Sequence, residues 1–430
     1  MRGPSSDCEA PVRDGETFLQ ALRDGREVWL DGERIDDVTA HVKTRGVAQT
    51  LASWYDLAPD DRALSWRVPS SVDALQKRAD ATRRMATPHG GLMGRTPDYL
   101  AVLMTGVRQA AAVYGQGDSR FTANIRAAHR AAAARDLCLT HAFANPQTGT
   151  AVHVTREDDA GIVLSGARSL ATLAPFADEI FSLTLPMQAL EPGQEHFCVG
   201  FSVPVATPGV KLMCRPSFGK GPLSSRFDEL DARVVFDDVH VPWERVLEYR
   251  NLALHAHIAQ TAPIWRQFLH HAATVNAVKM DLTLGVAHRL ATSSGVDRFP
   301  HIQEKIAEII DVAAGLRALR RASEVDADNV PGAEGLWPAA EPLLAMRDTF
   351  PEAFARVRQI LEQIGASGFF SADPLARLAW DLVGSEFASR QALYARYAFG
   401  DPVRHRRARY ADYDFSVADA MVDDMLSLGD

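Results

Sequence analysis

Two changes of residue pattern, near residues 145 and 255, constrain the fold of this 430-residue chain more than any other feature. Before residue 145, apolar residues recur at helical spacing, as in Leu100, Leu103, Met104 and Val107. Between the two changes, short apolar or alternating runs are separated by Gly, Pro and Asp, which is typical of antiparallel sheets. Helical spacing then returns. We therefore expect a mostly α protein with a central β domain, divided into residues 1–144, 145–254 and 255–430.

Local signals place the main elements. Thr96, Pro97 and Asp98 supply an N-cap, a proline at the first helical position and an early acidic residue, so a helix is expected to begin there. The alanine-rich residues 120–142 predict another helix. The period of Ile302, Ile306 and later apolar residues predicts an amphipathic helix in the C-terminal part, and the tail at 416–430 is amphipathic and acidic. The expected strands lie at 152–155, 161–165, 180–185, 197–203, 210–214 and 232–241.

Composition narrows the range of partners and locations. A formal net charge of -9 argues against binding to nucleic acid or an anionic membrane, because both need a basic face. No apolar run reaches the roughly 18 residues of a membrane-spanning helix, and residues 1–16 lack the pattern of a signal peptide. The four cysteines are too far apart to suggest a disulfide framework. The sequence therefore predicts a cytoplasmic protein with reduced thiols.

The sequence contains no convincing metal-binding or dinucleotide-binding motif. The glycines at 219 and 221 are followed by Pro222, so this segment cannot open a helix beneath a dinucleotide. Cys138 and His141 are three apart on the helix expected there, a possible ligand spacing, but no second pair lies nearby to complete a site. Neighbouring histidines point to different helix faces. We expect no metal from these patterns, which include the pairs His255/His257 and His270/His271.

Arg95 and Tyr99 are four residues apart at the start of a capped helix, so their side chains can share one side of its first turn. A cation and a hydroxyl at the positive end of a helix suit a bound phenolate. His141, a histidine with an ordinary pKa near 6.5, could accept the phenol proton. On the spacing alone, structural roles for these three residues are favoured over the phenol-binding role.

Long collinear motifs occur between residue 22 and about residue 402, at 22–35, 94–99, 139–147, 166–172, 225–229, 236–245, 365–368 and 379–387. These motifs resemble the 4-hydroxyphenylacetate 3-hydroxylase family. The resemblance implies an acyl-CoA-dehydrogenase-like, three-domain subunit that forms a homotetramer. Family members use O2 and reduced FAD (FADH2) from a separate flavin reductase, form a flavin C4a-hydroperoxide, and hydroxylate a phenol ortho to its hydroxyl.

The resemblance also implies roles for individual residues. Arg95, Tyr99 and His141 match the phenol-binding group, with His141 as base. The flavin positions are Asn145, Gln147, Thr172 and Ser367, whose amide and hydroxyl groups can hydrogen-bond a flavin. We expect the loop at 185–194 to act as a lid that excludes water.

One departure from the family concerns the substrate. The connection between Gly368 and Leu375 is shorter than usual, which suggests a substrate larger than a simple phenylacetate, free or bound to a carrier, in natural-product biosynthesis. Alternatives are N-oxygenation, halogenation, acyl-CoA dehydrogenation or dehydration on the same fold, or a non-catalytic oligomeric scaffold. A dehydratase would need several clustered cysteines for an iron–sulfur cluster.

Overall fold

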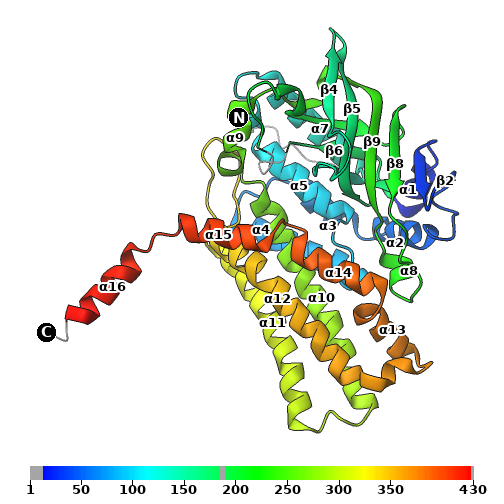
Figure 1. Ribbon diagram of the computed structural model, residues 1–430, viewed down its shortest axis with the longest axis vertical. Coiled ribbons are helices and arrows are strands. Elements are labelled where there is room, and N and C mark those ends of the chain that lie inside the picture. The colour runs from blue at the N-terminus through cyan, green and yellow to red at the C-terminus, as the bar shows by residue number, and fades with distance from the viewer. Residues whose placement is uncertain (1–12, 185–188, 428–430) are drawn as a thin grey trace, which may run out of the picture.

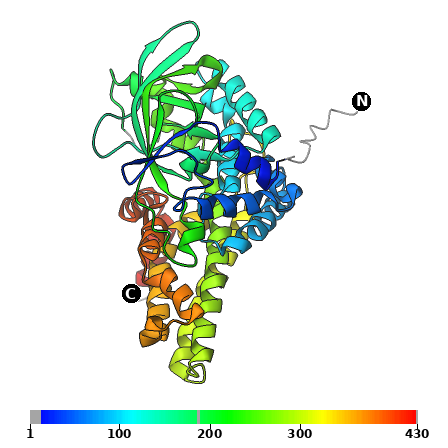
Figure 2. The same cartoon turned by 90° about the vertical axis from the view of Figure 1, so that its right-hand side faces the viewer.

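The computed structural model describes residues 13–184 and 189–427 (Figure 1). Helices of the N-terminal part pack beneath two β-sheets, and long helices of the C-terminal part extend away from the sheets (Figures 1 and 2). The fold is thus mostly α with a central β region, as the sequence predicts. The N-terminal helices are α1 (Gly15–Ala21), α2 (Arg45–Tyr55), α3 (Pro59–Trp66), α4 (Val72–Ala86), α5 (Pro97–Gln109), α6 (Ala111–Tyr114) and α7 (Arg120–Arg135).

The strands form two sheets. A six-stranded sheet has the order β2-β1-β8-β9-β5-β4, and a four-stranded sheet has the order β10-β7-β6-β3. Each predicted strand is present, with β5 and β9 longer and more continuous than the sequence suggested. The strands are β1 (Glu27–Leu30), β2 (Glu33–Ile35), β3 (Leu139–His141), β4 (His153–Glu157), β5 (Gly161–Thr172), β6 (Glu179–Ser182), β7 (Val199–Pro204), β8 (Val210–Cys214), β9 (Asp231–Pro242) and β10 (Val246–Tyr249).

The pairing of these strands joins the N-terminal part to the sheets. All pairs formed among β4 to β10 are antiparallel, as expected. Two parallel pairs arise from earlier strands, since β1 adds to β8 and β3 adds to β6. The chain before residue 145 therefore contributes strands to both sheets and is not purely helical.

The predicted helix at 120–142 is too long. Helix α7 ends at Arg135, because Asp136 adopts a left-handed conformation with φ of 45°. Its buried carboxylate accepts hydrogen bonds from Arg62 Nε at 2.8 Å and Trp66 Nε1 at 3.1 Å. This tertiary network overrides the helix propensity of the alanines. Residues 139–141 then form β3, so Cys138 and His141 do not share a helix and the metal-ligand spacing considered for them does not apply.

Helix α5 carries the site. It begins at Pro97 as predicted, with Thr96 at the N-cap position, although the Thr96 hydroxyl makes no capping bond to the helix backbone. It packs against α3, α7 and α10 and against β3. Nearly all of its residues are buried, so its first turn is fixed from several sides.

The C-terminal part is helical, with a bundle of α10, α11 and α12 at its centre (Figure 1). The predicted helix around Ile302 is α11, and the helical pattern at 375–397 is divided by Gly384 and Ser385 into α13 and α14. Among the described helices, none combines the length and apolarity needed to cross a bilayer. The helices are α9 (Leu252–Thr261), α10 (Trp265–Ser293), α11 (Pro300–Val325), α12 (Ala340–Gly365), α13 (Pro374–Val383), α14 (Glu386–Tyr397), α15 (Pro402–Asp412) and α16 (Ser416–Ser427).

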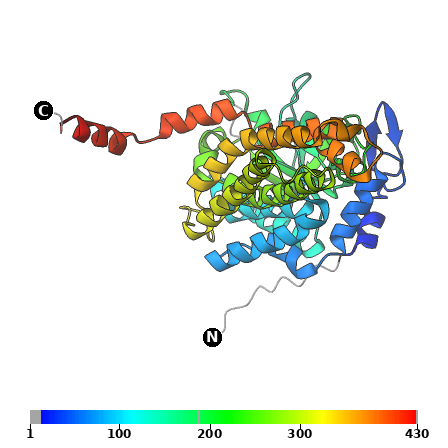
Figure 3. The same ribbon diagram turned by 90° about the horizontal axis from the view of Figure 1, so that it is seen from below.

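Helices α15 and α16 form an arm that extends from the rest of the chain (Figures 1 and 3). The amphipathic tail predicted at 416–430 is helical as far as Ser427. The arm exposes large apolar side chains, which a folded chain normally covers. They are Val403, Tyr410, Tyr413, Phe415, Val417, Met421, Val422, Met425 and Leu426.

Candidate active site

A buried arginine just before α5 and a buried tyrosine in the first turn of α5 lie side by side. The Arg95 guanidinium carbon lies 4.2 Å from the centre of the Tyr99 ring, and the residues are 4% and 2% exposed. This confirms that the two side chains share one side of the helix start. Burial raises the pKa of the Tyr99 hydroxyl and the nearby Arg95 opposes this rise, so Tyr99 is a neutral hydrogen-bond donor at neutral pH.

Helix α14 fixes the Arg95 side chain from the opposite side. Arg95 donates to the Tyr394 hydroxyl, which in turn donates to the Gly94 carbonyl at 3.0 Å. A second Arg95 nitrogen donates to the Ala398 carbonyl at 3.2 Å. Position 94 requires a glycine, because a Cβ there would lie 2.2 Å from the Tyr394 hydroxyl oxygen. The sequence gives no signal that Tyr394 belongs to this site, since it is one more residue of a helical pattern.

His141 ends β3, and its partner across the parallel pair is Phe181 of β6. Its ring packs edge-on against Phe143 at 5.2 Å. Burial, together with the positive charge of Arg95, lowers the pKa of His141 to about 3 although Asp231 opposes this. The imidazole is therefore neutral at physiological pH and able to accept a proton.

Two buried nitrogens at this site have no hydrogen-bond partner among the described residues. They are Nε of Arg95 and Nδ1 of His141. Buried polar atoms are usually satisfied, because desolvation without a partner costs free energy. An unsatisfied donor on a cation and an unsatisfied nitrogen on a neutral imidazole fit a bound hydroxyl or oxyanion between them.

A charged network connects the Arg95 side of the site to Thr172 at the end of β5. Glu229 accepts from the Arg95 backbone N–H at 2.6 Å and from Arg390 at 2.9 Å. Arg390 also donates to Asp231 at 3.2 Å, and Asp231 accepts from the Thr172 hydroxyl at 2.6 Å. The network holds Arg95 and Thr172 in fixed relative positions.

The ionisation of this network is set by its own charges. Burial alone would raise the pKa of Asp231, but Arg390, Arg215 and the Thr172 hydroxyl hold it below its ordinary value. Asp231 is therefore a carboxylate. Sequence reasoning did not single out Glu229, Asp231 or Arg390. Glu229 stands in a family motif, which was the available signal.

The amide positions predicted for the flavin lie directly after β3. The Asn145 side-chain oxygen accepts from Arg168 at 2.5 Å, and a bridge between Ala144 and Ser169 ties this segment to β5. Asn145 and Gln147 are both exposed. Thr140 donates to the Thr172 carbonyl at 2.7 Å, so the strand that carries His141 lies beside Thr172. Thr172 therefore lies near His141, and His141 is close enough to Arg95 for the arginine charge to lower the histidine pKa.

Ser367 is placed differently. It lies in an exposed 3-10 turn (Ala366–Phe370) between α12 and α13 and, within the described part of the chain, forms no hydrogen bond with the other predicted site residues. A hollow of about 430 Å³ adjoins this turn, with Phe369 of the turn in its wall. Two cationic side chains, Lys220 and Arg377, and two acidic ones, Asp381 and Glu386, also line the hollow, and Lys220 forms an ion pair with Glu386 at 3.1 Å. Part of the predicted lid, residues 185–188, lies outside the described residues.

Comparisons with known proteins agree with this geometry. Residues 14–247 match the model for the 4-hydroxyphenylacetate 3-hydroxylase N terminal region, and residues 256–372 and 374–427 match the C-terminal one. The chain is 34% identical to the 4-hydroxyphenylacetate 3-monooxygenase oxygenase component of Thermus thermophilus, over 94% of this chain and 95% of that protein.

Solved structures extend the comparison. A crystal structure of such an oxygenase component, complexed with FAD and 4-hydroxyphenylacetate, superposes with a TM-score of 0.89 at 32% identity, covering 97% of this chain and 99% of that one. An archaeal 4-hydroxybutyryl-CoA dehydratase shares the fold alone, with a TM-score of 0.84, 14% identity and coverage of 97% and 95%. With both family models matched along nearly its whole length, the chain belongs to the 4-hydroxyphenylacetate 3-hydroxylase family, whose fold is acyl-CoA-dehydrogenase-like.

Proposed function

We propose that this enzyme hydroxylates a phenol ortho to its hydroxyl, as the oxygenase component of a two-component, FADH2-dependent monooxygenase. The observation that carries the proposal is the convergence of Arg95, Tyr99 and His141 with two unsatisfied buried nitrogens. A structural relative with FAD and a phenolic substrate bound supports it. In the overall reaction, one oxygen atom of O2 enters the ring, the other leaves as water, and reduced FAD supplies two electrons.

The three residues would act on the phenol hydroxyl. Nδ1 of His141, in the tautomer that leaves it unprotonated, accepts the phenol proton. Burial and the charge of Arg95 give His141 a pKa of about 3, too low for this transfer alone, but the phenolate that forms supplies a negative charge next to the ring. Arg95 and the Tyr99 hydroxyl stabilise that oxyanion. Ionisation increases electron density at the ortho carbon, which makes this carbon the site of oxygen attack.

The candidate flavin residues fit the cofactor. Exposed amides of Asn145 and Gln147 and the hydroxyl of Thr172 offer the donors and acceptors that an isoalloxazine edge and ribityl chain require. When bound, reduced FAD supplies the electrons and activates O2. The Ser367 turn would contact the phosphate end, where Arg377 offers a cationic side chain in the adjoining hollow. Residues 189–194, with the rest of their loop, keep the role of a predicted lid.

The assembly and partners follow from the same proposal. A relative of this chain is named as an oxygenase component, which supports a separate flavin reductase as its partner. The apolar arm of α15 and α16 supports a homotetramer in which another subunit covers it. The cytoplasmic location stays a prediction from the sequence. The short connection after Gly368, where α13 begins at Pro374, supports a substrate larger than a phenylacetate, carrier-bound or free.

A single-turnover assay tests the proposal. Purified enzyme is mixed anaerobically with reduced FAD and a phenol, then exposed to O2, and products are identified by mass spectrometry. The panel contains small phenols, larger phenols, carrier-bound phenols and the O-methyl ether of each. We expect a catechol from at least one phenol and nothing from its ether, since an ether cannot ionise.

Other outcomes are decisive. Hydrogen peroxide as the only product from every phenol, without bound flavin, would favour the scaffold alternative. Equal hydroxylation of phenol and ether would remove His141 as the base. Efficient turnover of small phenols with none of the larger ones would contradict the larger substrate.

A further inference from the structure

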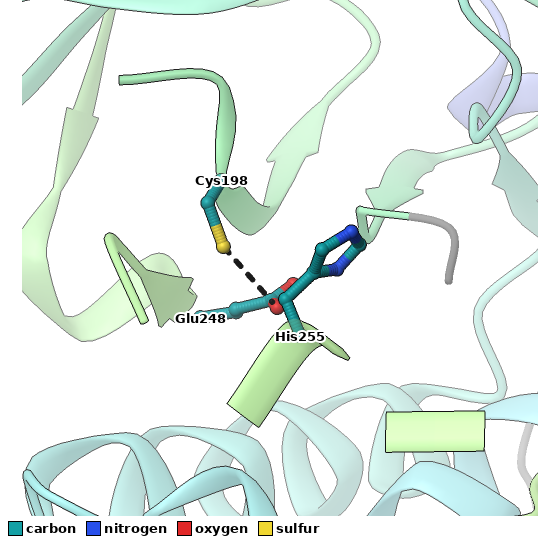
Figure 4. Close-up of side chains that lie close together, drawn as sticks. All are labelled: Cys198, Glu248 and His255. Carbon is teal, nitrogen blue, oxygen red and sulfur yellow. Dashed lines mark hydrogen bonds between the residues drawn. The ribbon is translucent and has the colours of Figure 1, made fainter. Parts of the chain in front are cut away.

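A second polar cluster lies between the four-stranded sheet and the start of the C-terminal helices. It consists of Cys198, just before β7, Glu248 in β10 and His255 in α9 (Figure 4). The residues are 0%, 1% and 3% exposed. The possible ligand atoms of the three all lie within 4.8 Å of one another. None of the three has a role in the proposed hydroxylation.

Glu248 is a buried carboxyl group whose hydrogen bonds to the described residues are long. The His255 ring and the Arg168 guanidinium interact with its charge. The carboxylate accepts a long bond from the Thr184 backbone N–H at 3.3 Å and one from the Cys198 thiol at 3.6 Å. Within residues 13–184 and 189–427, Glu248 forms no ion pair closer than 4.0 Å. A buried carboxylate is costly unless a cation balances it.

The three ligand types indicate which cation fits. Thiolate, imidazole and carboxylate together are the ligands of zinc, and magnesium or calcium would require oxygen ligands instead. We propose that Cys198, Glu248 and His255 bind one divalent metal ion of the zinc class. Three protein ligands leave the fourth tetrahedral position for water or another ligand.

The spacing needs only a small adjustment for this role. Zinc bond lengths and tetrahedral angles place ligand atoms about 3.5 Å apart. The Cys198 sulfur and a Glu248 oxygen already have this separation, at 3.6 Å. Figure 4 shows the thiol facing the carboxylate, with the imidazole beside it. Metal binding therefore requires the His255 ring to approach by on the order of 1 Å, which rotation of its side chain can supply.

The surroundings of the cluster hold its ligands in place. The Thr184 hydroxyl accepts from the backbone N–H of Val199, the residue after Cys198, at 3.0 Å, which fixes the chain at the start of β7. The Asn251 side chain also caps α9 by accepting from the Leu254 N–H at 3.0 Å, which fixes the helix turn that carries His255. Such outer contacts orient metal ligands in known sites.

A metal ion at this site would connect the four-stranded sheet to the C-terminal helices. Cys198 directly precedes β7, Glu248 lies on β10, the strand paired with β7, and His255 lies on the helix that follows. One ion would therefore cross-link the edge of the four-stranded sheet to the first helix of the C-terminal part. The inference is independent of the hydroxylation, because it concerns other side chains.

The test uses the full-length protein before flavin is added. It is incubated with zinc chloride, separated from excess metal by gel filtration, and analysed for metal by mass spectrometry. Cobalt replaces zinc in a parallel sample, because cobalt bound to a thiolate gives a charge-transfer band in the near ultraviolet. We expect close to one metal per chain, the cobalt band, and a rise in Tm of about 4 °C with saturating zinc.

Matched variants locate the site. Cys198→Ser should lose the cobalt band and the bound metal, and Cys214→Ser, a control at a thiol outside the cluster, should keep both. Absence of metal and of the cobalt band in the wild-type protein would overturn the proposal without any variant. Full metal content in Cys198→Ser would overturn it as well.

One further result would reassign the cluster. If the protein binds no metal, and Glu248→Gln raises KM only for phenols that carry an amine, then Glu248 balances a substrate ammonium group and the metal proposal is wrong. KM for phenols without an amine is the control in that comparison. Failure of the hydroxylation assay itself would not affect the metal measurements.

Discussion

At the scale of single residues, Arg95 is held before any substrate arrives. Its guanidinium stacks on Tyr99, donates to Tyr394 and reaches the Ala398 carbonyl. The planar group with several fixed donors suits this role, and a lysine cannot reproduce it. Within the described residues, Nε is the Arg95 side-chain nitrogen that lacks a hydrogen-bond partner. The side chain is therefore positioned to donate a further hydrogen bond in the direction of Nε.

We therefore expect Arg95→Lys to lower kcat/KM for the phenol by about 100-fold, the usual cost of one misplaced oxyanion donor. Reduced FAD is supplied by a separate reductase, and catechol and peroxide are both quantified. The control is Arg108→Lys on the same helix, whose partner is Glu334 at 2.7 Å. Equal activity of the two variants would contradict a role for Arg95 at the phenol.

The sequence predicted part of this site well. The pairing of Arg95 with Tyr99 follows from helical spacing after a capping signal, which is local information. His141 was placed on the wrong element, because the strand that carries it is stabilised by Asp136, Arg62 and Trp66 far along the chain. Arg62 and Trp66 are too far from Asp136 in the sequence for a local residue pattern to predict these contacts.

At the scale of elements, the site depends on how closely α14 approaches the segment before α5. Gly94 allows the Tyr394 hydroxyl to donate to its carbonyl at 3.0 Å. Any side chain at position 94 would overlap Tyr394. The contact joins elements from opposite ends of the chain, so the sequence could predict the helices but not their approach.

Gly94→Ala should therefore displace Tyr394 and Arg95, lower activity by at least about 10-fold, and destabilise the protein by about 1–3 kcal/mol. Activity and thermal unfolding are measured together. Gly285→Ala is the matched control, because Gly285 lies within α10 and has open space around it. That control should be neutral or stabilising by up to about 1 kcal/mol. Identical behaviour of both variants would refute the close approach.

At the scale of the whole molecule, the arm formed by α15 and α16 exposes large apolar side chains to solvent. Met421 and Met425 are 62% and 66% exposed, four residues apart on α16. They lie on one side of the helix, beside acidic residues that keep its other side polar. The mostly α fold with a central β region was predictable from residue patterns. The position of the arm was not, because the residue pattern of one helix does not specify which surface that helix contacts.

Replacing Met421 and Met425 with glutamine should shift the protein to a smaller assembly, since the apolar contact with another subunit is lost. Light scattering after gel filtration measures the mass. Asp419→Asn with Asp423→Asn, on the same helix, should leave the mass unchanged. An unchanged mass in the methionine variant would exclude this arm as the contact.

Buried histidines make stability depend on pH. Burial lowers the pKa of His89, His129 and His270 to about 4. Between pH 6.5 and 4 the unfolded chain binds these protons and the folded chain does not, so stability falls as the pH falls. Each histidine contributes about 1.4 kcal/mol per pH unit within this window.

We expect Tm to decrease steadily from pH 7 to pH 5 and His129→Gln to lessen the decrease. The control is His301→Gln on an exposed helix position, which should follow the wild type. A pH dependence that is the same in all three proteins would show that His129 does not titrate as its burial requires.

The parallel pairing of β1 with β8 has a consequence for synthesis of the protein. Glu27 of β1 pairs with Lys211 of β8. The hairpin of β1 and β2 therefore cannot complete this pairing until the intervening chain has been translated. Until β8 leaves the ribosome, the β1 edge offers unpaired backbone groups to any extended segment nearby. Slow translation before residue 211 should therefore favour aggregation, and the nascent chain should require a chaperone over that interval.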